Sequence, residues 1–224
     1  MNKLHYISLR TALALAVSAG SLSPVLAQET INAERPGFTN GAYTVTRPQY
    51  ELGFTRYKDP ARRDVLNDGG LLRLPAGKTL EARIGVPSRA GSEWGDGSLG
   101  VKWRVSDDDS HGIGLAINAT AIQRSAPQYA FEAEHALSNL WGLQADYVHN
   151  PDRTHAGAVN LGYTVNPKVS LFAEVFSQGD GQWVDGGVTL LSGKDVQLDL
   201  NAGVGLQRGN RNKNFVGVGL ARRW

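Results

Sequence analysis

The segment 214–224 constrains the fold most, because large apolar side chains alternate along it with small or polar ones. Val216 and Val218 fall on one face of an extended strand, whereas Gly217 and Gly219 fall on the other. Such a strand separates two unlike environments. In a soluble sheet the large residues face a core. In a closed membrane barrel they face lipid, and the aromatic residue that ends the chain lies at the membrane interface.

The first 27 residues are typical of a cleaved signal peptide rather than of a folded element. Lys3 and Arg10 precede an apolar run, 11–19, and small residues follow at the expected cleavage site. The mature chain then carries 21 basic and 21 acidic residues, which argues against a nucleic-acid partner. It has no cysteine, and no later apolar run approaches the roughly 20 residues of a membrane helix.

After an extended N-terminal lead-in, 28–48, the chain divides into segments of period two that are separated by turn signals. The expected strands are 50–58, 70–74, 79–86, 98–105, 111–120, 128–137, 140–149, 156–165, 169–178, 181–191, 195–206 and 214–224.

The connections between these strands alternate in length, since the odd ones are mostly long and the even ones mostly tight. Long outer loops, short periplasmic turns and an even strand number are typical of outer-membrane barrels. A closed sheet also leaves no backbone group unpaired in lipid. The sequence therefore predicts an all-β fold, a transmembrane antiparallel up-and-down β-barrel of about 12 strands over 49–224. A secreted soluble β domain is the alternative.

Four stretches resemble a known family. They are 34–57 (ERPGFTNGAYTVTRPQYELGFTRY), 95–105 (GDGSLGVKWRV), 184–205 (VDGGVTLLSGKDVQLDLNAGVG) and the closing strand. They are similar to the outer-membrane transporter-like β-barrel family linked to the meta-pathway of phenol degradation (MetA-like). The resemblance implies passive passage of small solutes across the outer membrane, with aromatic or other organic compounds as the expected class.

Most strand charges fall on the face opposite the large apolar residues, which is the lumen of a barrel. Bases come mainly from the second to fourth strands and acids mainly from the sixth, seventh and ninth to eleventh. One interpretation is a narrow passage with a transverse field and a mild preference for cations. The other is a set of ion pairs without a through-path, because 12 strands lie between filled and aqueous barrels. The expected lumen-lining residues are Glu51, Arg73, Glu81, Arg83, Lys102, Arg104, Glu132, Glu134, Asp146, Glu174, Asp185, Asp199 and Arg223.

Closure of the barrel would bring the outer loops 59–69 and 207–213 together. Their charges predict a basic rim that binds lipopolysaccharide phosphates or attracts anionic solutes. Ordinary solvated loop charge is the alternative. The rim residues are Lys58, Arg62, Arg63, Arg208, Arg211 and Lys213.

The aromatic residues divide between the two faces. Those expected on the outside are typical of interfacial girdles: Tyr50, Phe54, Trp103, Tyr129, Tyr147, Tyr163 and Trp224. Phe172, Phe176 and Trp183 fall on the inner face, where they either contact an aromatic solute or fill the lumen.

Enzymatic interpretations are weak. Ser110 and His111 are neighbours in a turn, which is poor geometry for a catalytic triad. His149 and His155 bracket an outer loop without a third ligand at metal-site spacing. We therefore expect no catalytic residue, metal or cofactor.

The expected function is passage of small solutes through an outer-membrane barrel. The expected partners are outer-membrane lipid and lipopolysaccharide, a small solute, and the barrel-assembly machinery through the C-terminal strand. A non-conducting barrel that is structural or contacts lipopolysaccharide is the alternative.

Overall fold

The computed structural model describes residues 31–58, 65–90, 93–106, 112–207 and 214–224. The first six strands are Gln49–Lys58 (β1), Val65–Pro75 (β2), Leu80–Val86 (β3), Arg89–Ala90 (β4), Glu93–Trp94 (β5) and Ser98–Ser106 (β6). The next four are Gly114–Ile122 (β7), Gln128–Ala136 (β8), Trp141–His149 (β9) and His155–Asn166 (β10). The last four are Val169–Gln178 (β11), Gly181–Ser192 (β12), Val196–Gly205 (β13) and Asn214–Arg223 (β14).

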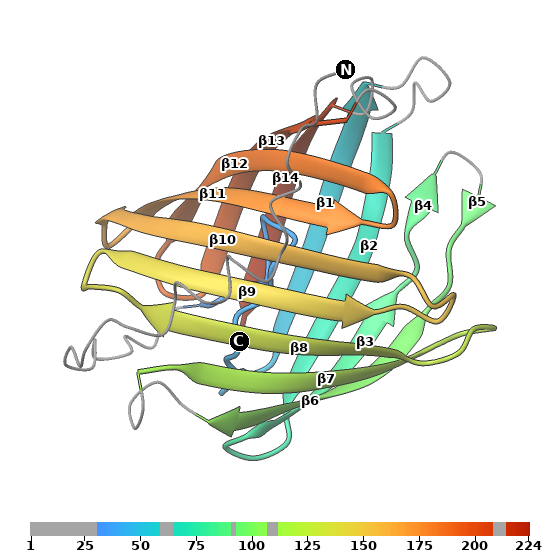
Figure 1. The fold of residues 1–224 in the computed structure, drawn as a ribbon. Helices are drawn as coiled ribbons and strands as arrows, with labels where there is room; N and C mark the ends of the chain where they lie inside the picture. Colours follow the sequence, from blue (N-terminus) through green and yellow to red (C-terminus); the bar gives the residue numbers. More distant parts are fainter. Residues whose placement is uncertain (1–30, 59–64, 91–92, 107–111, 208–213) are drawn as a thin grey trace.

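The sheet closes on itself. Each long strand pairs with the long strand before it and the long strand after it in the sequence. The first and last strands, β1 and β14, also pair with each other, which closes the barrel. The closing register runs from Gln49 opposite Arg223 to Lys58 opposite Asn214. All these pairings are antiparallel, so the expected closed barrel of 12 long strands is confirmed. Figure 1 shows the strands wrapping around a common interior.

The barrel buries its charges and exposes its large apolar residues. Along β14, Val216, Val218 and Leu220 are exposed, whereas Gly217 and Gly219 are buried. The largest fully buried side chains are all polar or charged: Arg73, Lys102, Gln49, Glu81, Glu132, Glu174 and Asp199. A soluble sandwich would place its apolar residues between two sheets. The observed distribution instead suits hydrocarbon outside and a polar interior.

None of the described residues forms a helix long and apolar enough to cross a membrane.

The strand boundaries differ from expectation most in the first and third connections, and β7 begins at Gly114 rather than at residue 111. β2 begins at Val65 instead of residue 70, so the first connection is shorter than the sequence indicated. The third connection contains a two-residue hairpin, β4–β5, in which β4 extends the outer end of β2. Both additions lie where polar and glycine-rich residues concealed the alternation. They lengthen the wall on the side of β2 and leave the inward and outward faces unchanged.

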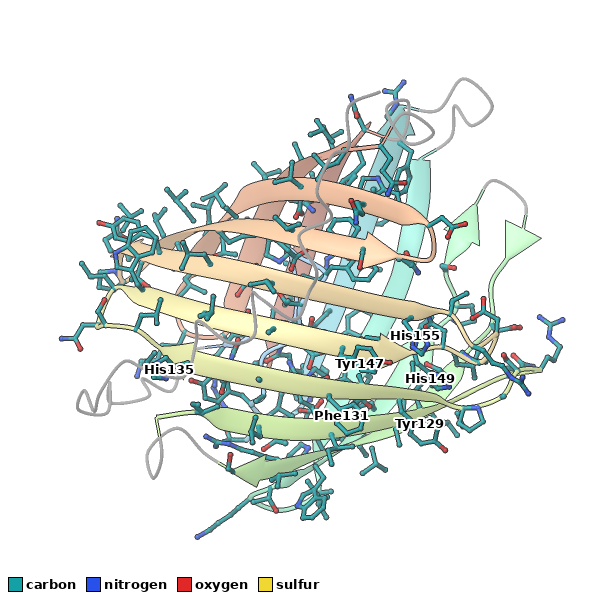
Figure 2. All side chains as sticks on the ribbon, in the orientation of Figure 1. Tyr129, Phe131, His135, Tyr147, His149 and His155 are labelled. Carbon is teal, nitrogen blue, oxygen red and sulfur yellow. The ribbon has the colours of Figure 1, made fainter. Side chains whose placement is uncertain are left out.

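Exposed aromatic residues gather on the outer surface of β8 and β9, as Figure 2 shows for Tyr129, Phe131 and Tyr147. Tyr147 meets His155 of β10, its hydroxyl oxygen lying 2.7 Å from His155 Nδ1. His149 lies opposite His155 in the register, with the two Nδ1 atoms 3.4 Å apart. An amphipathic aromatic cluster near one end of the strands is typical of a membrane interface.

A charge on the outer surface provides a test of the membrane-facing side. Leu200 lies midway along β13 and is 51% exposed. We expect Leu200→Arg to destabilise folding into vesicles by about 2–4 kcal/mol, because a cation near the bilayer midplane loses its hydration. Urea titration of barrels folded in vesicles measures the change, with Leu200→Ala as the control. Equal midpoints for the two variants would contradict a lipid-facing position.

Candidate functional site in the barrel lumen

Residues 31–48, called the lumen segment below, lie inside the barrel (Figure 1). The amide of Ile31 donates to the carbonyl of Lys194, in the turn between β12 and β13, at 2.9 Å. At the other end of the segment, the amide of Trp224 donates to the carbonyl of Pro48 at 3.2 Å. Both contacts lie at the end of the barrel where β1 begins and β14 ends. The segment therefore enters and leaves the lumen at the same end.

Glu34 of the lumen segment lies among three basic residues of the barrel wall, Arg73, Arg83 and Lys102. Its carboxylate accepts hydrogen bonds from Arg83 Nη1 at 2.7 Å and from Lys102 Nζ at 2.8 Å, and Arg83 Nη2 binds its second oxygen. Arg73 Nη2 lies 3.3 Å from the same carboxylate. All four side chains are buried. A paired Arg–carboxylate contact of this kind is among the stronger polar interactions in proteins.

The same three bases also contact acids on the barrel wall. Arg73 Nε lies 2.8 Å from Glu81 and its Nη1 lies 3.1 Å from Glu51, while Lys102 Nζ lies 2.6 Å from Glu132. Bases and acids thus form one buried network across β1, β2, β3, β6 and β8. Because each buried charge keeps a partner, the cost of removing it from water is offset.

Carboxylates of the barrel wall bind the backbone of the lumen segment. Glu174 accepts hydrogen bonds from the amides of Phe38 and Thr39, at 2.6 and 2.7 Å, and from the Thr39 hydroxyl at 2.6 Å. Four other amide-to-carboxylate bonds follow the same pattern: Asn40 to Asp146 (2.7 Å), Ala42 to Glu134 (3.1 Å), Val45 to Glu81 (2.9 Å) and Glu34 to Glu51 (3.0 Å). The segment has no ladder of its own, so the wall acids satisfy its amides.

Arg35 reaches the opposite wall. Its Nε lies 3.9 Å from the fully buried carboxylate of Asp199, and its carbonyl accepts a hydrogen bond from Gln197 Nε2 at 2.8 Å. The guanidinium occupies space above Gly53 and Gly219, where an added Cβ would lie 1.9 and 2.7 Å from its atoms. Glycine at these two inward positions therefore makes room for the Arg35 side chain.

The inner aromatic residues pack against the lumen segment. Phe38 stacks on Phe176 with ring centroids 4.6 Å apart, and Phe176 stacks on Trp183 at 5.2 Å. Phe215 of β14 completes this cluster, at 6.3 Å from Phe176. With the segment in place, these rings fill part of the lumen. Phe172, the third inner aromatic of the sequence analysis, is half-buried.

An ion pair fixes the end of the segment where it leaves the lumen. Asp195, in the turn between β12 and β13, binds both Arg47 and Arg223, with Arg223 Nε at 3.0 Å. The hydrogen bond from Arg223 and the charge of Arg47 hold the pKa of Asp195 below its usual range. This carboxylate therefore stays ionised at neutral pH. Its contacts weaken only when acidification protonates it, below the ordinary titration range of aspartate.

A cavity of about 280 Å³ lies beside the lumen segment, toward the end of the barrel opposite the termini. Phe38 and Asn40 of the segment line it, so the segment forms one boundary of this space. The wall residues around it are mostly polar or small: Ser98, Asn118, Thr120, Gln128, Ala130, Asn150, Ala156 and Gln178. Its chemistry suits water and small polar solutes.

The structure buries 12 of the 13 residues that the sequence assigned to the lumen. The exception is Arg104, which is half-buried with its guanidinium 5.3 Å from the ring centroid of Tyr43.

Of the basic rim, only the backbone of Lys58, at the end of β1, is described; Arg62, Arg63, Arg208, Arg211 and Lys213 lie outside the described residues. Ser110 and His111 also lie outside them. Sequence reasoning missed Glu34, Arg35 and Phe38, because the lead-in has no strand periodicity.

Among the residues that the structure describes, no three His, Asp or Glu side chains lie close enough together to hold a metal ion.

The closed strands, the apolar exterior and the polar interior define a transmembrane antiparallel β-barrel. No protein-family model and no curated protein sequence matches the chain. Solved structures do match. The KdgM porin aligns with a TM-score of 0.59 at 8% identity, covering 79% of this chain and 99% of that one. The NanC porin aligns with a TM-score of 0.53 at 8% identity, covering 78% and 98%.

The COG4313 outer membrane channel of Pseudomonas putida F1 aligns with a TM-score of 0.53 at 12% identity, covering 85% of this chain and 99% of that one. At such low identity these similarities establish a shared fold. The similar structures are two porins and one outer membrane channel.

Proposed function

We propose that the protein is a passive diffusion channel of the outer membrane whose lumen is closed by its own N-terminal segment. The observation that supports the closed state most strongly is Glu34, which occupies a three-base site in the lumen while wall carboxylates hold the backbone after it. Small solutes would pass when the lumen segment leaves this position. The similarity of the fold to porins supports a channel in general.

The solute class follows from the lining. The family resemblance implies aromatic or other organic compounds, but Phe38 of the segment already stacks on the inner ring of Phe176. The cavity beside the segment is lined mainly by amide and hydroxyl side chains. We therefore propose small polar organic solutes, and aromatic compounds as a class that would contact Phe176 and Trp183 only after the segment has moved.

The occupied lumen also favours a second candidate, a non-conducting barrel that is structural or contacts lipopolysaccharide. The lumen segment then acts as a permanent strut, since its ion pairs connect the walls carrying Arg73, Lys102 and Asp199. The barrel would meet outer-membrane lipid through its apolar surface and lipopolysaccharide through the basic rim. The C-terminal strand would be its contact with the barrel-assembly machinery.

Conductance in planar bilayers separates the two candidates. We expect the full mature chain to be closed most of the time, and a variant lacking 31–46 to open steadily with at least a roughly tenfold higher mean conductance, because a filled constriction excludes hydrated ions. The deletion keeps Arg47, and with it the ion pair to Asp195. The open variant should prefer cations, since eight acids and five bases line its interior.

Silence of both proteins in the bilayer would support the non-conducting barrel and overturn the channel. Equal conductance of both would show that the lumen segment does not close the path. A variant with Arg47→Ala alone is the matched control, because it disturbs only an exposed ion pair at the end of the segment.

A further inference from the structure

The lumen contains two pairs of carboxylates that lie directly opposite each other on neighbouring strands. Glu132 faces Asp146 across β8 and β9, and Glu174 faces Asp185 across β11 and β12. All four side chains are more than nine-tenths buried. Like charges at directly opposed positions destabilise a sheet, and burial increases the cost of each charge. The arrangement therefore needs positive charge or hydrogen-bond donors that reach these carboxylates inside the barrel.

In the closed barrel, Lys102 of the wall pairs with Glu132, and the lumen segment supplies donors to one carboxylate of each pair, Asp146 and Glu174. Asp146 Oδ2 accepts from both the amide and the side-chain Nδ2 of Asn40, at 2.7 and 3.0 Å. Glu174 accepts from the amides of Phe38 and Thr39. These contacts are made mainly by the backbone, so the carboxylates recognise N–H groups with little regard to the side chain that accompanies them.

Arg35 adds a cation to the same set of contacts. Its guanidinium lies near Asp199 in a space that the side chains of β1 and β14 leave open. The acidic wall thus binds both neutral and cationic N–H donors of the protein's own chain.

Acceptors remain unused even with the segment in place. Asp146 Oδ1, Asp185 Oδ1 and Glu132 Oε1 are buried and have no hydrogen-bond partner among the described residues. Asp146 and Asp185 belong to different carboxylate pairs, so the excess of acceptors is distributed along the wall. A buried acceptor without a donor is costly, and a ligand rich in N–H groups removes that cost.

We infer that the open lumen selects organic cations that carry N–H donors, such as primary ammonium or guanidinium compounds, and that the lumen segment occupies their site in the closed state. The inference rests on the proposed channel function and names the solute class of that channel. It predicts discrimination by hydrogen-bond donors in addition to discrimination by charge.

The test uses the variant lacking 31–46 in planar bilayers, with K⁺ as the carrier of current. The probes are 1,4-diaminobutane, a dication at neutral pH, and its bis(trimethylammonium) counterpart. Both nitrogens of the second probe are quaternary, so it has the same charge and no N–H donor. We expect diaminobutane to reduce the K⁺ current by half at a concentration at least about tenfold lower than the methylated probe. A hydrogen bond to a charged group contributes more than a factor of ten in affinity. Equal potency of the two compounds would overturn the inference while leaving the channel function intact.

Two variants locate the effect. Asp146→Asn combined with Asp185→Asn, in the same deletion background, should abolish most of the difference between the probes. Asp96→Asn is the matched control, because Asp96 pairs with Arg124 in the loops outside the lumen. If the double variant and the Asp96→Asn control changed the preference for diaminobutane equally, the site would not be in the lumen.

The outcome is also separable from failure of the channel. If the deletion variant does not conduct, equilibrium dialysis of each probe against the detergent-solubilised barrel measures binding without current. Preferential binding of diaminobutane would then support the lumen site although the channel function had failed. Equal or undetectable binding of the two probes would overturn the inference.

Discussion

Replacing Glu34 by alanine is expected to release the lumen segment and raise the open probability of the barrel by about a hundredfold. Glu34 is the acid through which the segment binds Arg73, Arg83 and Lys102 together. Removing one partner of a buried ion pair costs about 3–5 kcal/mol where the remaining charge is left alone. Here each base keeps an acid on the wall. We therefore expect the lower end, about 3 kcal/mol, which corresponds to roughly two powers of ten.

The measurement is the open probability of single channels in planar bilayers at fixed voltage. Glu34→Gln should lie between the native protein and the alanine variant, because the amide oxygen still accepts hydrogen bonds from the guanidinium groups. If Glu34→Ala had the same open probability as the native protein, the three bases would not hold the segment in the lumen. The Arg47→Ala control should change the open probability by less than about fivefold, as expected for an exposed pair.

Replacing Glu174 by alanine should have the second-largest effect. This residue accepts three hydrogen bonds from the lumen segment, two from backbone amides and one from the Thr39 hydroxyl. A hydrogen bond to a charged group contributes about 1.5–3 kcal/mol. Part of the loss is recovered when water reaches the freed amides, and removal of Glu174 relieves repulsion of Asp185. The expected cost of closing is therefore about 2 kcal/mol, or a roughly thirtyfold rise in open probability.

Thr39→Val provides the control for this prediction. It removes only the hydroxyl contact at 2.6 Å and keeps the two amide contacts, so it should produce a clearly smaller rise than Glu174→Ala. If the two variants behaved alike, the backbone amides would contribute nothing to closure. That outcome would contradict the role assigned to the acidic wall.

The barrel itself could be predicted from the sequence because its physical rule is local. Each strand alternates between lipid and lumen, so Val218 and Gly219 have opposite environments whatever the rest of the chain does. Long and short connections then give the order and direction of the strands. The alternation places Glu81 and Lys102 on one face, and the structure buries both.

The position of the lumen segment could not be predicted in the same way. Its residues form no strand, and Pro36 and Gly37 are typical of many extended linkers. Its partners lie far away in sequence: the Glu34 carboxylate binds residues 39 to 68 positions later, and the Phe38 amide binds Glu174, 136 positions later. One signal was available, because an excess of charges facing a narrow lumen requires counter-charges and donors from another part of the chain.

The closed state requires residues 31–45 to lie inside the lumen, and thiol labelling tests this position. The protein has no cysteine, so Ala42→Cys introduces a single thiol at a position with no exposed surface, whose amide binds Glu134. Thr46→Cys places the thiol on an exposed residue of the same segment. We predict that a small water-soluble maleimide labels the folded Thr46 variant at least about a hundredfold faster, since labelling of a buried thiol requires local opening. Equal rates would mean that residue 42 is not enclosed in the lumen.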